Sequence, residues 1–258
     1  MKSKAYAKIN LFLKVLDERD NGMHNLEMVN ITVGLADELE LNLTENGKIE
    51  VTTSIPKLNG SDNLSYKVAE YMKKVYRVKE GVQIYIEKKI PVGGGLAGGS
   101  SDAAETIKCL NELWKLNLSF DQMIEIAKKF GSDIPYCLYR VPAIVRGVGD
   151  IIEPIDLNIE NYEISLFSPR VNVSTGYVFK NLSNTNSKNG SLEENLQKLM
   201  SKDYQIFKEG LRNDLEETVF SLYPEVKQEY DLLKRVYGKD GLFMTGSGST
   251  IVKISEKK

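Results

Sequence analysis

A run of glycine and other small residues at positions 91–104 constrains this chain more than any other feature. Its sequence is PVGGGLAGGSSDAA, with five glycines among the seven positions 93–99. Glycine tolerates positive φ and lets a ligand approach the backbone, so such a run can turn successive N–H groups toward one anion. Apolar residues then recur every three or four positions as far as Trp114, which predicts a helix, and Asp102 with Glu105 resembles a capping box at its start. The segment predicts a phosphate-binding loop that ends at a helix N-terminus.

Two familiar phosphate motifs fit this run less well. Gly93, Gly95 and Gly98 satisfy the dinucleotide pattern GxGxxG, but no strand ending in an acidic residue follows about twenty positions later. Gly93 and Gly98 also have the spacing of a P-loop, but Gly99-Ser100 stands where that motif needs Lys followed by Ser or Thr. A flexible Gly/Ser linker is the remaining alternative. We disfavour it because the run joins a strand-like segment to a strongly periodic helix.

Composition indicates an ordinary globular protein. The chain has 258 residues, of which 41% are hydrophobic, which is enough for one large domain or two ordinary ones. The 34 basic and 36 acidic residues nearly cancel, so we expect no nucleic-acid or membrane partner, and any anionic ligand must be bound locally. No apolar run reaches the length of a membrane span, and we expect a cytoplasmic protein.

Histidine and cysteine usage narrows the possible chemistry. His24 is the only histidine, which argues against a His-rich metal site and against a Ser-His-Asp hydrolase. Cys109 and Cys137 lie far apart in apolar surroundings, so we expect buried thiols rather than a disulfide or a metal site.

The first half of the chain predicts antiparallel strands followed by helices. Asn46-Gly47 is the strongest hairpin signal, and Gly131 to Pro135 predicts a helix stop. The predicted strands are 7–16 and 23–35, joined by a turn at 20–22, then 37–43 and 49–53, and 82–90; the predicted helices are 62–75, the one after the glycine-rich run, and 120–130.

The second half predicts a further domain. Gly147 to Asp150, followed by Pro154, interrupts the pattern, and we place a boundary there that gives domains 1–150 and 151–258. The predicted strands are 143–146, 162–167, 242–244 and 250–254; the predicted helices are 192–200, 204–222 and 225–237; and 181–191 is a predicted polar loop. Thr245 to Ser249 forms a second small-residue loop that could approach a phosphate.

Seven short segments, taken in order, resemble the GHMP kinases over nearly the whole chain. They are AKINLFL at 7–13, GMH at 22–24, DNL at 62–64, the glycine-rich run, GSDIP at 131–135, GVGD at 147–150 and MTGSG at 244–248. The shorter loop of homoserine and mevalonate kinases resembles Gly-Leu-Gly-Ser-Ser-Ala-Ala. Here Gly98-Gly99 precede Ser100-Ser101, which is similar to family members whose substrate carries a cytidine diphosphate.

The resemblance implies an α+β protein with the two-domain GHMP kinase fold. The N-terminal domain would be mixed α/β and the C-terminal domain ferredoxin-like. The family usually continues through another helix and strand after the segment near Met244, so we expect the C-terminal domain to lack its usual last helix and strand.

The resemblance also implies an activity. We expect an ATP-dependent kinase that uses Mg²⁺ and phosphorylates an alcohol group of a small cytidine diphosphate substrate in non-mevalonate isoprenoid precursor biosynthesis, acting as a monomer or weak homodimer. The alternatives are another GHMP small-alcohol kinase and a non-catalytic nucleotide-binding relative. The sequence assigns no metal ligands.

The family's functional residues carry over where this sequence matches its motifs. Lys8 and Asp133 would be the catalytic pair, although without the motif set a strand lysine reads as a solvated charge and Asp133 as a turn residue. The substrate contacts would be Asn10, Met23, His24, Thr175 and Phe179, with His24 pairing with cytosine. The ATP contacts would be Asn63, Lys88, Pro91, Gly93, Gly94, Gly95, Leu96, Ala97, Gly98, Gly99, Ser100 and Ser101.

Two positions depart from the family. Met23 stands where an aromatic residue commonly stacks on cytosine, and Asn30 stands where some relatives have Phe. We therefore expect weaker cytosine binding.

Overall fold

The computed structural model describes residues 1–169, 171–182 and 190–257. They form two compact units whose segments alternate along the chain. Unit 1 consists of Met1–Ala7, Val33–Pro91 and Ala97–Arg140, and unit 2 of Lys8–Thr32, Val92–Leu96 and the described residues from Val141 onward. The long strands β1 (Lys2–Glu18) and β2 (His24–Thr44) contribute residues to both units. The expected division at residue 150 stays a prediction.

Unit 1 contains a sheet whose order differs from the expected hairpin. The second half of β2 pairs antiparallel with β4 (Gly81–Glu87), with Glu38 opposite Glu87. β3 (Ile49–Thr53) pairs in parallel with the other edge of β4. β4 therefore lies between β2 and β3, and the hairpin predicted at Asn46-Gly47 is wrong. The turn reverses the chain there, but the strands that follow and precede it are separated by a third strand.

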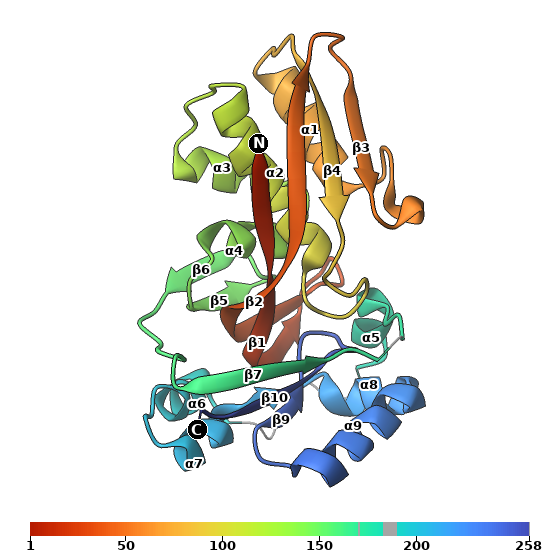
Figure 1. Cartoon of the computed structure of the whole chain (residues 1–258). Coiled ribbons are helices and arrows are strands. Elements are labelled where there is room, and N and C mark those ends of the chain that lie inside the picture. Colours follow the sequence, from red (N-terminus) through yellow and green to blue (C-terminus); the bar gives the residue numbers. More distant parts are fainter. Residues whose placement is uncertain (170, 183–189, 258) are drawn as a thin grey trace. The chain divides into compact units, whose positions relative to one another are not determined.

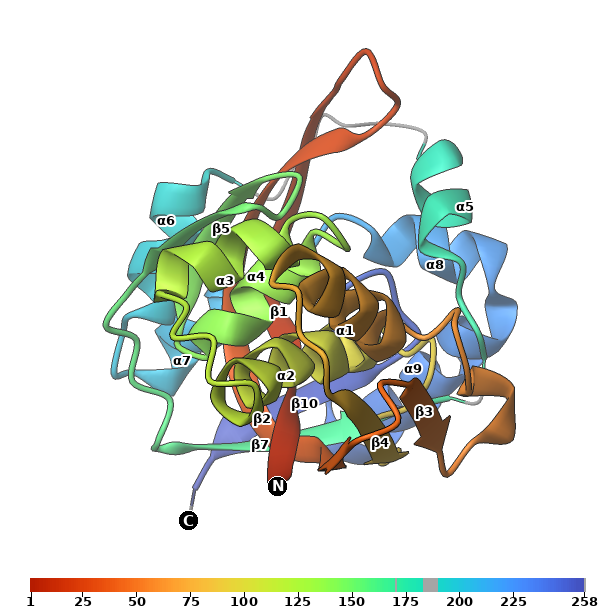
Figure 2. The same ribbon diagram turned by 90° about the horizontal axis from the view of Figure 1, so that it is seen from above.

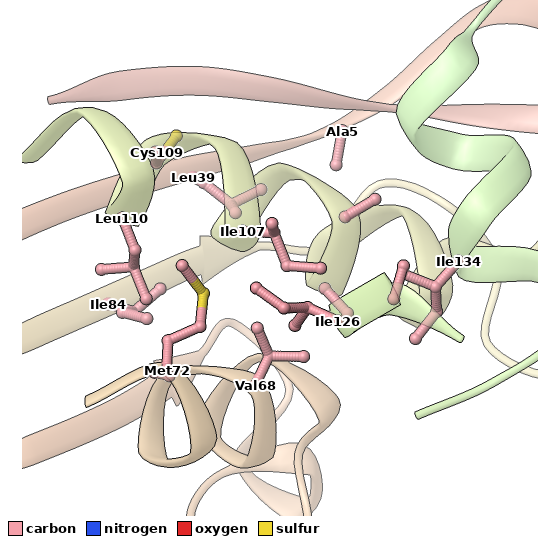
Figure 3. Close-up of a cluster of buried hydrophobic side chains, with 14 of the residues drawn as sticks. Ala5, Leu39, Val68, Met72, Ile84, Ile107, Cys109, Leu110, Ile126 and Ile134 are labelled. Carbon is pink, nitrogen blue, oxygen red and sulfur yellow. The ribbon is translucent and has the colours of Figure 1, made fainter. Parts of the chain in front are cut away.

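Four helices complete unit 1, and their apolar faces form its core. They are α1 (Leu64–Val75), α2 (Gly98–Leu113), α3 (Phe120–Ala127) and α4 (Asp133–Tyr139), preceded by the short 3₁₀ helix η1 (Pro56–Leu58). α1 lies beside α2, and α3 and α4 pack against α2 from another side (Figure 2). Val68 and Met72 of α1, Ile107 and Leu110 of α2, and Ile84 of β4 meet in one cluster (Figure 3). Burial of such side chains contributes roughly 1.5–3 kcal/mol each.

The helix boundaries follow local capping with two corrections. Asn63 caps α1, and Ser119 with Gln122 forms a capping box on α3, as the sequence pattern permits. The capping box predicted at Asp102 and Glu105 is wrong, because α2 already begins at Gly98. The stop predicted after residue 130 is followed at once by α4, a helix that the sequence analysis did not predict.

Unit 2 contains the first half of β2 and a separate three-stranded sheet. The first half of β2 pairs with β5 (Ala143–Gly147), which pairs with β6 (Ile151–Pro154). The separate sheet has the order β7–β10–β9, with β10 (Ile251–Glu256) antiparallel to both β7 (Tyr162–Phe167) and β9 (Leu242–Met244) (Figure 1).

The helices of unit 2 match the prediction except near residue 212 and at α5 (Thr175–Lys180), a helix that the sequence analysis did not predict. They are α5, α6 (Leu192–Leu199), α7 (Tyr204–Phe207), the 3₁₀ helix η2 (Lys208–Gly210), α8 (Glu216–Leu222) and α9 (Pro224–Tyr237). The short strand β8 (Arg212–Asn213) pairs in parallel with β1 and interrupts the helix predicted over 204–222. The ferredoxin-like form stays a prediction, and the polar loop predicted at 181–191 falls mostly on residues outside the described ranges.

Both cysteines are buried thiols, as expected. Within the described part of the chain, no helix combines the length and the apolar character needed to cross a membrane.

Candidate functional site

The first part of the glycine-rich loop packs against the second small-residue loop in unit 2. Gly93 and Gly95 have φ of 70° and 74°, in the region that favours glycine. The N–H of Thr250 donates to the carbonyl of Gly94 at 3.2 Å. A Cβ on Gly95 would lie 2.8 Å from the carbonyl oxygens of Thr245 and Gly248. Gly95 is therefore required by contact between the two loops.

The second part of the loop forms the start of α2 in unit 1 and fits a bound phosphate. Ala97 precedes the helix with φ of 55°, and no side chain caps the first turn. The Ser101 hydroxyl, one turn into the helix, donates to the carbonyl of Tyr6. Gly99 is exposed, and a Cβ there would meet only Leu64, at 3.9 Å. An uncapped N-terminus with open space beside it suits the phosphates of ATP.

The side chains of Asn63 and Lys88 already have partners in unit 1. Asn63 accepts from the N–H of Ser65 and donates to the carbonyl of Leu58, both at 2.9 Å. The Lys88 side chain is buried and its ammonium contacts two carboxylates, described below. The polar ends of both side chains are thus already engaged within unit 1. The expected contacts of these two residues with adenosine stay predictions.

Lys8 belongs to a buried polar network in which each hydrogen-bond donor and acceptor can be assigned. Its ammonium donates to Oδ1 of Asn10 at 3.1 Å. Lysine can only donate, so this bond fixes which end of the Asn10 amide is oxygen. Nδ2 of Asn10 then donates to Oδ1 of Asn30 at 2.6 Å and contacts the sulfur of Met28. The backbone N–H of Asn10 donates to Oγ1 of Thr245 at 2.8 Å, which ties the network to the second small-residue loop.

Asp133 is the first residue of α4 and is half-buried. It belongs to unit 1 and Lys8 to unit 2, so their expected pairing stays a prediction.

The structure brings together two of the expected cytidine contacts in unit 2. The rings of His24, at the start of β2, and Phe179, on α5, have centroids 5.2 Å apart and are tilted by 30°. Nδ1 of His24 is buried and has no hydrogen-bond partner among the described residues. Met23, which precedes His24 in the chain, is 47% exposed, and Thr175 hydrogen-bonds to Ser247 at 2.7 Å. An aromatic face can stack on a base, whereas a hydrogen bond from His24 to cytosine stays a prediction.

Sequence reasoning missed several residues that organise these segments. Thr245 holds Asn10, and Asn213 holds the second small-residue loop by donating to the carbonyls of Met244 and Gly246 at 2.7 and 2.9 Å. Asp37 and Asp102 surround Lys88. Asp37 is a polar residue within a long strand, but this signal does not name its partner, and Asn213 lies in a segment that was predicted to be helical.

No group of three or more His, Cys, Asp or Glu side chains in the described ranges is arranged to hold a metal ion. Mg²⁺ is often held by one or two carboxylates together with substrate phosphates. The geometry thus assigns no metal ligands among the residues that the structure describes.

Family models and relatives identify the chain's family. The model described as the GHMP kinases N terminal domain matches residues 63–140, and the model described as GHMP kinases C terminal matches residues 192–258. The chain is 40% identical over 256 residues to 4-diphosphocytidyl-2-C-methyl-D-erythritol kinase of Shouchella clausii, covering 99% of this chain and 86% of the relative. This chain belongs to the GHMP kinase family. It is therefore a phosphotransferase, as the sequence resemblance implied.

Two further comparisons agree with that membership. The enzyme with the same name from Brevibacillus brevis is 40% identical over 257 residues, covering 99% of this chain and 87% of the relative. A crystal structure of 4-(cytidine 5'-diphospho)-2C-methyl-D-erythritol kinase superposes with a TM-score of 0.81 at 30% identity, covering 99% of this chain and 90% of that one. A homoserine kinase from Cytophaga hutchinsonii, at 18% identity and a TM-score of 0.73, with 100% and 85% covered, shares the fold. The expected two-domain GHMP kinase fold is confirmed.

Proposed function

We propose that this kinase transfers the γ-phosphoryl group of ATP to the 2-hydroxyl of 4-diphosphocytidyl-2-C-methyl-D-erythritol, in the synthesis of isoprenoid precursors. The observation that carries the proposal is the 40% identity to curated kinases of that name along 99% of the chain. The His24–Phe179 pair supports it, because a kinase of a plain alcohol has no need of a base-binding surface.

The uncapped first turn of α2, from Gly98 to Ser101, would hold the nucleotide phosphates. ATP supplies the phosphoryl group, and Mg²⁺ would enter with the phosphates. Phosphoryl transfer spreads negative charge over the transferring oxygens, so the protein acts mainly by position and electrostatics. Backbone N–H groups and the positive end of the α2 dipole meet this need without reorganisation.

Lys8 and Asp133 would act at the acceptor hydroxyl. The Lys8 ammonium is held by Asn10, and it would supply a positive charge to balance the negative charge that develops on the phosphoryl group. Asp133 would orient the hydroxyl and accept its proton. A carboxylate is a much weaker base than an alkoxide, so the proton moves late in the reaction.

The test is release of ADP from ATP and Mg²⁺ with a panel of alcohols. We expect turnover with 4-diphosphocytidyl-2-C-methyl-D-erythritol and none with homoserine or mevalonate. Turnover with one of those alcohols alone would assign a different GHMP activity. ATP binding without turnover on any of them would indicate a non-catalytic relative. The cytoplasmic location and the monomer or weak homodimer remain predictions.

A further inference from the structure

Three charged side chains of unit 1 meet where the glycine-rich loop begins and ends. They are Asp37 of β2, Lys88 just after β4, and Asp102 of α2, with side-chain exposures of 0%, 5% and 4%. The Lys88 ammonium donates to Oδ2 of Asp37 and, at 2.5 Å, to Oδ2 of Asp102. The other oxygen of Asp37 accepts from the N–H groups of Lys89 and Ile90, at 2.5 and 2.8 Å. The cluster thus binds the residues just before the loop and the helix just after it.

The charge balance of this cluster argues against a role in stability alone. Two carboxylates share one ammonium, so the cluster must either hold an uncompensated negative charge in a buried site or keep one carboxyl protonated, and neither arrangement is favourable. Burial of an ion pair costs several kcal/mol per ion, and well-packed apolar residues often replace such pairs without loss. Oδ1 of Asp102 is also buried and has no hydrogen-bond partner among the described residues. The arrangement is costly, so its value to the protein must lie in the geometry it fixes.

The first turn of α2 is the element whose geometry is fixed. In unit 1, side-chain caps hold the N-termini of α1 and α3, whereas α2 and α4 have none. Asp102 lies one turn into α2 and reaches back to Lys88. The bond between Asp102 and Lys88 therefore fixes the direction of the first turn of α2. The N–H groups of Gly98 to Ser100 remain without a capping side chain.

We propose that Asp37, Lys88 and Asp102 are positioning residues for the phosphates of a nucleoside triphosphate. Their ion pairs join the segment that follows β4 to the first turn of α2, so that the uncapped N–H groups keep one direction. This inference rests on the proposed function, because it takes the start of α2 as the site of the ATP phosphates. Lys88 then acts through the backbone it orders, without reaching a phosphate itself.

Variants at Asp102 separate this geometry from simple loss of a charge. Asp102→Ala removes the link to Lys88 and leaves Lys88 paired with Asp37, so the buried charges balance and the chain should fold. Asp102→Leu fills the same space and repeats the test if the alanine variant is unstable. Asp102→Asn retains an oxygen that can accept from Lys88. Glu105→Gln is the matched control, since Glu105 is a buried acid on the same helix that pairs with Arg140.

The readouts are KM and kcat for ATP, the Kd for ATP by calorimetry, and the melting temperature. We expect Asp102→Ala and Asp102→Leu to raise both the KM and the Kd at least fivefold, with kcat within threefold of the wild type. Asp102→Asn and Glu105→Gln should stay within twofold in KM and Kd. We expect this set of results only if the hydrogen bond between Asp102 and Lys88 positions the ATP-binding turn. If Asp102 only stabilised the fold, its variants would lower the melting temperature without a selective change in ATP affinity.

Three results would overturn the inference. They are unchanged ATP affinity in folded Asp102→Ala and Asp102→Leu, an Asp102→Asn variant as weak as Asp102→Ala, and an equal loss in Glu105→Gln. Wild-type protein that binds no ATP would overturn the proposed function and this inference with it. Wild-type protein that binds ATP beside an equally tight Asp102→Ala would overturn only the inference.

Discussion

At the scale of single residues, the ammonium of Lys8 sets the orientation of its surroundings. Because it only donates, it fixes Asn10, and Asn10 in turn fixes Asn30. A charge held in one place needs no reorganisation when negative charge develops nearby, and this is how such groups lower an activation barrier. Asn30, where some relatives have Phe, is thus part of the support of the proposed catalytic lysine.

Loss of either proposed catalytic charge should reduce turnover and spare ATP binding. We expect Lys8→Met and Asp133→Asn each to lower kcat by about a hundredfold or more, as when a group acting at the transferring phosphoryl is removed. Both substitutions keep the side chain near its original size. Steady-state kinetics gives kcat, and calorimetry with ATP supplies the control. A kcat within a few-fold of the wild type in either variant would remove that residue from the mechanism.

Asp102 should make stability depend on pH. Burial raises the pKa of its carboxyl from 3.8 to about 7; the Lys88 ammonium opposes this rise and the Asp37 carboxylate adds to it. Between about pH 4 and pH 7 the folded chain then holds a proton that the unfolded chain has released, so this group lowers stability as the pH rises. The asparagine of the Asp102→Asn variant cannot ionise, so the variant does not lose stability in this way as the pH rises.

The measurement is the free energy of unfolding of wild type and Asp102→Asn by urea titration across that pH range. The advantage of the variant should grow toward pH 7, by about 1.4 kcal/mol for each unit by which the pKa is raised. An advantage that is constant with pH would show that Asp102 is already ionised throughout the range.

Sequence could name the proposed catalytic and binding residues but not their partners. Lys8, His24 and Asp133 stand inside short motifs, so a resemblance locates them. Asp37 lies 51 positions from Lys88, and no periodicity joins the two. The bond exists because β2 and β4 are neighbours in the sheet, which is a property of the fold.

At the scale of elements, local signals placed most helices and strands and failed where a distant partner decided. Asn46-Gly47 does turn the chain, but β4 enters between the strands on either side, since β3 pairs with β4 in parallel. A hairpin signal describes only the turn. The start of α2 was also misplaced: the helix begins at Gly98, so Asp102 lies inside it and pairs with the distant Lys88 instead of capping the helix.

Two glycines of the loop should respond differently to alanine. In Gly95→Ala the new Cβ would lie 2.8 Å from two carbonyl oxygens, at a φ of 74°, so we expect a loss of about 1–3 kcal/mol in stability. In Gly99→Ala the new Cβ meets only Leu64, and a helical Gly→Ala change commonly adds about 0.4–1 kcal/mol. Gly99→Ala should nevertheless weaken ATP binding, because its Cβ occupies space beside the uncapped turn.

Thermal unfolding and ATP calorimetry on the two variants separate packing from ligand approach. Gly95→Ala is the matched control, because it shows how much ATP affinity changes when the loop structure itself is destabilised. Unchanged ATP affinity in Gly99→Ala would place the phosphates away from this turn.

At the scale of the whole molecule, each ligand should stabilise the folded chain by mass action. A ligand present at one hundred times its Kd adds about 2.7 kcal/mol. For a chain of this size that corresponds to a rise of roughly 5–11 °C in melting temperature. ATP and cytidine diphosphate should each produce such a rise in the wild type, if the nucleotide and the cytidine substrate have sites of their own.

Phe179→Ala distinguishes the two sites without any need for turnover. Base stacking on an aromatic ring contributes roughly 1–3 kcal/mol, so loss of the Phe179 ring beside His24 should weaken cytidine diphosphate binding about tenfold. The melting-temperature rise with cytidine diphosphate should then shrink at a fixed ligand concentration, while the rise with ATP stays the same. Met23→Tyr, which adds a ring at the exposed position before His24, should enlarge the cytidine diphosphate response. An equal loss of both responses in Phe179→Ala would mean that the substitution disturbs the fold. A cytidine diphosphate response that Phe179→Ala leaves intact would place cytosine elsewhere, because a base stacked on this ring cannot be indifferent to its removal.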